Sequence, residues 1–174
     1  RELASDTDEH TCAVSESAAM ATFWERSSCR ATLTGLLAQT LRAADPSAAY
    51  TFGLFRDCGM AIMLRKFKGY ALLLSGNDAD GLLFVHLENE RFALDHARVG
   101  RLLAQSWQLP ETLSAAILHH HDADAMRGAH VSLDPASMRL IALAALADHL
   151  EAPPHAPPAG ETLLACSQLD LSPD

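Results

Sequence analysis

The stretch that decides the fold is residues 51–59, Thr-Phe-Gly-Leu-Phe-Arg-Asp-Cys-Gly. It belongs to a largely apolar segment, 47–67, whose pattern predicts a helix. The two glycines in it are poor helix formers, so they indicate a kink or the close passage of another backbone. Asp57 is the anomaly, because a carboxylate among apolar side chains is costly unless it is paired, protonated or bound to a cation. The segment therefore predicts a buried helix that carries a polar site.

Helical patterns continue on both sides of this stretch, and alanine and leucine, which are good helix formers, dominate the composition. The predicted helices are 18–44, 47–67, 95–108, 111–121, 137–150 and a short one at 161–166. We therefore predict an all-α fold. Residues 1–17 are predicted to be a polar lead-in or the remnant of a preceding segment. Residues 18–174 are predicted to form one helical domain with a Pro-rich spacer at 152–160.

Composition excludes several classes of protein. The chain has 174 residues, enough for one domain, and its 13 basic and 22 acidic residues give a net charge of −9. This acidity disfavours nucleic acid as a partner. No apolar run approaches the roughly 18 residues that span a membrane, and no signal peptide is visible. The four cysteines form no C-x-x-C pair, which indicates a reducing compartment, so the predicted location is the cytoplasm.

Potential metal ligands fall on the apolar faces of the later helices. Asp148 shares a face with Ile141 and Ala144, so it is predicted to point inward. His120 shares a face with Ile117 in the same way. His119 is its neighbour in the sequence, and His96 lies at the start of the predicted helix 95–108. Imidazole and carboxylate groups are the donors that zinc, manganese and iron sites use. The plainer alternatives are that the aspartates form structural ion pairs and that His121, beside Asp122, is a solvated helix end.

The order of these segments resembles the HD-related output domain family, HDOD. Residues 51–59 look like that family's Gly-Leu-Leu-His-Asp-Ile-Gly segment, and the later blocks follow in the same order. The further matching segments are 23–31, 95–104, 107–110, 117–120, 147–148 and 169–174. The resemblance implies an HD-domain-like helical bundle and a bacterial signalling context, without catalysis. It also implies an N-terminal lobe of several helices, which this chain is predicted largely to lack.

The resemblance implies a degenerate metal site. Active HD enzymes hold the core metal with two histidines and two aspartates, and the aspartates correspond to Asp57 and Asp148. The histidine positions carry Arg56 and, in the most plausible alignment, Arg26. Arginine has no lone pair to offer a metal, so we hypothesise that the two arginines neutralise the two aspartates instead. The additional ligands of two-metal HD enzymes resemble His96, His119 and His120.

Three functions follow from these residues. The first is a non-catalytic regulatory domain that acts through protein partners or flanking signalling domains, with no cofactor and an oligomeric state that the sequence does not indicate. The second is a metal-dependent phosphohydrolase or phosphodiesterase that holds Fe, Mn or Zn with Asp57, His96, His120 and Asp148. The third is a phosphate or nucleotide sensor in which the two arginines grip a phosphate.

Overall fold

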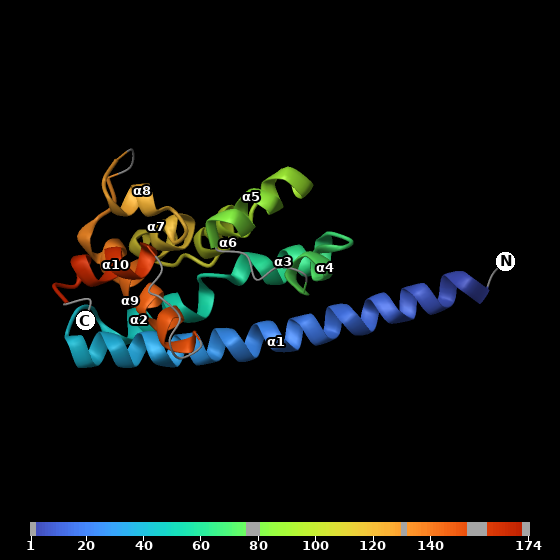
Figure 1. The fold of residues 1–174 in the computed structure, drawn as a ribbon, viewed down its shortest axis with the longest axis horizontal. Helices are drawn as coiled ribbons and strands as arrows, with labels where there is room; N and C mark the ends of the chain where they lie inside the picture. The colour runs from blue at the N-terminus through green and yellow to red at the C-terminus, as the bar shows by residue number, and fades with distance from the viewer. Residues whose placement is uncertain (1–2, 76–80, 130–131, 153–159, 172–174) are drawn as a thin grey trace.

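The computed structural model describes residues 3–75, 81–129, 132–152 and 160–171, and every regular element in them is a helix (Figure 1). The predicted all-α class is therefore confirmed. In chain order the helices are α1 (Leu3–Leu41), α2 (Pro46–Phe55), α3 (Cys58–Lys66), α4 (Tyr70–Ser75), α5 (Gly81–Phe92), α6 (His96–Ser106), α7 (Glu111–His119), α8 (Ala123–Met126), α9 (Pro135–Glu151) and α10 (Gly160–Gln168). None of the described helices combines the length and the apolar character that a membrane crossing requires.

Helix α1 begins at Leu3, well before the predicted start at Ala18. Figure 1 shows it lying along one side of the other helices, with its N-terminal part extending beyond them. It ends at Leu41, and Asp45 then caps α2 by accepting a hydrogen bond from the Ala48 amide at 2.8 Å. Pro at the first position of α2 is compatible with a helix start, because its missing N–H is not needed there.

The segment predicted as one helix over 47–67 is two helices, α2 and α3, separated at Arg56 and Asp57. Asp57 has φ −100° and ψ 11°, outside the helical region. The predicted close passage of another backbone is confirmed at both glycines. A Cβ on Gly53 would lie 2.8 Å from the Ala31 Cα of α1, and one on Gly59 would lie 2.0 Å from the His96 carbonyl oxygen of α6. The α2–α3 junction is thus pressed between α1 and α6.

Two cores flank this junction. The larger is built mainly from α2, α7 and α9 around Phe52, Ile117 and Leu143, which are fully buried. The smaller joins α3, α4 and α5 around Met63 and Tyr70. The other predicted helices agree with α6, α7, α9 and α10 apart from their ends, whereas α4 and α8 were not predicted. Most of the predicted Pro-rich spacer at 152–160 lies outside the described residues.

Candidate functional site

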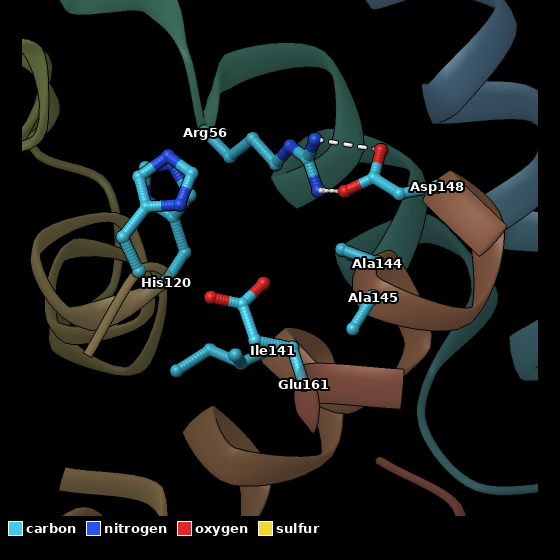
Figure 2. A pocket seen from close by; sticks show the side chains of 8 residues that line it. Arg56, His120, Ile141, Ala144, Ala145, Asp148 and Glu161 are labelled. Atoms are coloured by element: carbon cyan, nitrogen blue, oxygen red, sulfur yellow. Dashed lines mark hydrogen bonds and ion pairs between the residues drawn. The ribbon is translucent and has the colours of Figure 1, made fainter. Parts of the chain in front are cut away.

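The site is built around the α2–α3 junction, where Arg56 and Asp57 are both buried although they are charged. Arg56 donates a hydrogen bond from Nη2 to Oδ1 of Asp148 in α9, and its Nη1 forms an ion pair with Asp148 Oδ2, both at 2.8 Å (Figure 2). Its Nε donates to Asp57 Oδ2 at 3.2 Å. The planar guanidinium fork suits this two-point contact with a carboxylate. Asp57 is buried, as its place in the sequence suggested, and Arg56 pairs with both aspartates, whereas the side chain of Asp148 is partly exposed.

The second arginine of the site is Arg30, and the prediction of Arg26 was wrong. Arg26 is exposed on α1, one helical turn earlier. Arg30 lies 2.8 Å from Asp57 Oδ2 through Nη1, and its Nε lies 3.0 Å from Asp148 Oδ1. The same Nε lies 3.3 Å from Glu151 Oε2 at the end of α9. The physical reason is the crossing point: Gly53 lets α2 meet α1 at Ala31, so the residue beside the junction is Arg30.

Charge pairing dominates the protonation of this half of the site. Burial by itself would raise the pKa of Asp57, but the guanidinium groups of Arg56 and Arg30 hold it well below the usual value. Burial would likewise lower the pKa of Arg56, yet the carboxylates of Asp148 and Asp57 raise it. Pairing thus favours the ionised form of both groups. Asp57 and Asp148 are fully engaged by arginine on this side.

The other face of Asp57 meets histidines. Asp57 Oδ1 lies 3.1 Å from Nε2 of His120 and 3.7 Å from Nε2 of His96, and these two nitrogens are 3.4 Å apart. His96 is fully buried because it opens α6 against the junction, and His120 is buried just beyond the last turn of α7. Burial lowers the pKa of His120. The predicted association of these two histidines with Asp57 is present in the structure.

A further buried carboxylate, which the sequence analysis did not identify, supports His96. Glu88 of α5 is fully buried, and its Oε2 accepts hydrogen bonds from the His96 amide at 3.0 Å and from His96 Nδ1 at 2.7 Å. Its other oxygen accepts a short hydrogen bond from the Tyr70 hydroxyl. A carboxylate that holds one nitrogen of a histidine fixes which nitrogen faces the site. Glu88 was missed because nothing in its segment distinguishes it from a surface glutamate.

Among the described residues, Asp57, His96, His120 and His121 form a group that could hold a metal ion, because one donor atom from each lies within 4.8 Å of the others. The group shares Asp57, His96 and His120 with the predicted ligand set and has His121 in place of Asp148. His121 belongs to the group rather than to a solvated helix end, because α7 stops at His119 and the chain then turns His121 inward. His119 points elsewhere, with Nδ1 3.3 Å from Asp122 Oδ2. Asp148 is occupied by the arginines.

A small cavity opens beside this network. The side chains that line it, most of them labelled in Figure 2, are those of Arg56, His120, His121, Ile141, Ala144, Ala145, Asp148 and Glu161. It has room for little more than a water molecule. The cavity is therefore too small for a nucleotide or a phosphodiester.

Known structures share this fold. Over 88% of this chain, the MmoQ response regulator from Methylococcus capsulatus str. Bath is 27% identical with a TM-score of 0.62; the match covers 58% of that chain. An HDOD domain protein of unknown function from Geobacter sulfurreducens is 25% identical with a TM-score of 0.63, over 85% of this chain and 51% of its own. A candidate phosphohydrolase from Shewanella amazonensis SB2B is similar in fold, with 22% identity and a TM-score of 0.58. That match covers 87% of this chain and 55% of the other.

This chain thus spans between half and three fifths of the length of these solved chains. No curated protein matches it. The HDOD domain model matches residues 7–123, which is most of the chain and includes α2, α3, α6 and α7 with their buried charged residues. The chain belongs to the HDOD domain family.

Proposed function

We propose that this chain is a non-catalytic regulatory domain of a bacterial signalling protein, in which arginine side chains have taken the place of the core metal ion. The observation that carries the proposal is the pairing of Arg30 and Arg56 with both Asp57 and Asp148. Arginine is a permanent cation with five donors and no lone pair. It satisfies two carboxylates that would otherwise need a metal, and it cannot itself bind one.

Hydrolysis would require a metal that keeps an open position for an activated water. A cation placed between Asp57 and Asp148 would have to displace two guanidinium groups, one of which is almost fully buried. Separating such a pair leaves an uncompensated charge, at a cost of about 3–5 kcal/mol. The small cavity also offers no space for a substrate. These features favour a domain that acts through protein contacts, and the similarity to the MmoQ response regulator supports a signalling context.

The test is a search for metal-dependent phosphodiester hydrolysis. Purified protein is assayed with bis(p-nitrophenyl) phosphate and with cyclic dinucleotides in the presence of Mn²⁺, Fe²⁺ or Zn²⁺. We expect no turnover above that of an Asp57→Ala variant. Turnover by the unmodified protein that Asp57→Ala abolishes would overturn the proposal.

A gain-of-binding experiment tests the role of the arginines directly. Replacing both arginines, as Arg30→His with Arg56→His, removes two positive charges and adds two nitrogen donors beside Asp57 and Asp148. We expect the double variant to bind one more equivalent of Zn²⁺ or Mn²⁺ than the unmodified protein in equilibrium dialysis. An unchanged stoichiometry in a folded double variant would show that the arginines do not occupy a metal position.

The second candidate is a metal-dependent phosphohydrolase, and the Asp57, His96, His120 and His121 group is the observation in its favour. The hydrolysis assay separates it from the first candidate. A phosphate sensor is less favoured, because the donors of Arg56 are already bound to carboxylates.

A further inference from the structure

The hydrogen-bond partners of His96 and His120 fix their tautomers. His120 Nδ1 lies 2.7 Å from the carbonyl oxygen of Ile117, which can only accept, so Nδ1 carries the proton. His96 Nδ1 lies 2.7 Å from a carboxylate oxygen of Glu88, so it also carries its proton. In the neutral rings each Nε2 is then a lone pair. Both lone pairs point into the space beside Asp57.

Three acceptors therefore face one another with no proton between them. The two Nε2 atoms are 3.4 Å apart, and Asp57 Oδ1 lies 3.1 Å from one and 3.7 Å from the other. Converging lone pairs in a buried site repel one another unless a cation lies between them. A metal ion or a proton held on the histidine side would supply that cation. The geometry is that of a site completed by a cation.

The charge balance of the network points the same way. The two arginines contact three carboxylates, and a fourth lies against His96 on the histidine side. This leaves an excess of two negative charges when every carboxylate is ionised and the histidines are neutral. The carboxylates are those of Asp57, Glu88, Asp148 and Glu151. The two oxygens of Asp57 have different partners, because Oδ2 faces the arginines and Oδ1 faces the histidines. The histidine side is where positive charge is missing.

His121 and Glu88 complete the environment that a metal ion needs. One donor atom of His121 lies within 4.8 Å of those of the other three residues, and its Nδ1 is buried with no hydrogen-bond partner in the described part of the chain. Glu88, held by Tyr70, accepts the Nδ1 proton of His96, which orients a metal-binding Nε2 and makes it more basic.

We propose that Asp57, His96, His120 and His121 bind one divalent transition-metal ion of the zinc type. Three imidazole nitrogens and one carboxylate oxygen suit tetrahedral zinc or cobalt better than manganese, which prefers oxygen. With four protein ligands the site is closed, so the ion stabilises the domain and activates no water. The site adjoins the arginine-filled position and shares Asp57 with it, using Oδ1 where the arginines use Oδ2. It goes beyond the proposed function, which concerns catalysis and not this ion.

The experiment uses the whole chain without a histidine tag, stripped with a chelator and dialysed. Zn²⁺ binding is measured by competition with a chromophoric chelator, Co²⁺ binding by its visible absorption, and stability by the melting temperature with and without Zn²⁺. His121→Gln is the test variant because His121 is partly accessible. His119→Gln is the matched control, because it removes a histidine from the same helix end outside the group.

We expect one equivalent of zinc, a higher melting temperature with zinc, and a tetrahedral-type Co²⁺ spectrum. His121→Gln should weaken zinc binding about tenfold or more, and His119→Gln should leave it nearly unchanged. Glu88→Gln, which removes the carboxylate but keeps the shape, should weaken binding by roughly 10- to 100-fold. No zinc uptake by the stripped protein would overturn the proposal and leave a proton as the bound cation. Equal losses in both histidine variants would also overturn it, because they would indicate surface binding by the histidine run. Hydrolysis is scored separately, so failure here leaves the proposed function intact.

Discussion

Replacing Arg56 by methionine removes a buried positive charge from the site while keeping much of the side-chain volume. The Arg56 side chain is 5% exposed. It bridges the side chains of Asp57, which is 6% exposed, and Asp148, which is 37% exposed. Methionine can fill the space of the aliphatic part of the arginine side chain, but it donates no hydrogen bond. The two carboxylates then compete for the one remaining arginine, Arg30, at 2.8 and 3.0 Å.

The expected loss of stability follows from the sharing of one arginine by two carboxylates. Removing one partner of a fully buried ion pair costs about 3–5 kcal/mol, because the other charge is left uncompensated. Asp57 retains Arg30, and Asp148 is partly solvated, so we expect Arg56→Met to lower the free energy of unfolding by about 2–4 kcal/mol. Asp148→Asn should cost less, about 1–2 kcal/mol, because water screens that carboxylate. The double variant should show a coupling energy of about 1–2 kcal/mol, as expected for residues in one network.

The assay is urea unfolding followed by circular dichroism, with the slopes compared so that changes in the unfolded state are detected. Arg127→Met is the control, since Arg127 is 51% exposed and pairs with an exposed Asp124 at 2.9 Å. Its cost should stay below about 1 kcal/mol. If Arg56→Met costs no more than this control, or if the two site substitutions add without coupling, the arginines do not hold the site together.

Three further predictions follow from single positions. Gly59→Ala should abolish or severely weaken folding, measured by thermal unfolding, because its Cβ would lie 2.0 Å from the His96 carbonyl oxygen, whereas Gly160→Ala, with nothing within 4 Å, should be tolerated. Burial raises the pKa of Cys58 to about 12, so mass-spectrometric mapping after iodoacetamide should find Cys58 unmodified in the folded protein while the exposed Cys29 reacts. Asp134 caps α9, and hydrogen bonds from Ser137 lower its pKa. At a pH above about 4, the ordinary pKa of Asp, Asp134→Ala should therefore lower the free energy of unfolding by about 1 kcal/mol. Because the folded pKa is the lower one, this difference should shrink as pH falls below about 4, which urea titrations at pH 7 and pH 3 would detect.

Most of the fold could be predicted because helix patterns and breakers are local. Pro46 and Pro110 separate helices in the structure where the sequence places them. The glycines of 47–67 indicated a kink or a close backbone, but the position of the break could not be predicted, because only the three-dimensional crossing with α1 and α6 explains why the helix divides at Arg56 and Asp57. The early start of α1 at Leu3 was missed because polar residues carry no apolar periodicity.

The residues of the site also fall into those that the sequence could predict and those that it could not. Asp57 and Asp148 were predictable, since a carboxylate on an apolar face needs a partner. Choosing Arg30 over Arg26 required the crossing point of α1 and α2, which no helical period supplies. His121 was missed because helical spacing stops applying once α7 ends at His119.

The side chain of Asp57 contacts both the arginines and the histidines of the site. An Asp57→Asn substitution tests the two sides separately, because the arginines need a negative charge and the histidine lone pairs need a proton or a cation. An Asp57→Asn side chain can direct its oxygen to the arginines and its amide group to the Nε2 lone pairs of His96 and His120. The amide then supplies the protons that the histidine side lacks, although it loses the charge that the arginines need. In metal-free protein we therefore expect Asp57→Asn to be less destabilising than Asp57→Ala by about 1–2 kcal/mol. Zinc should stabilise neither variant appreciably, because both lose the carboxylate ligand. Equal destabilisation by asparagine and alanine would mean that the histidine side has no unmet lone pairs, and the reasoning for a cation beside them would fail.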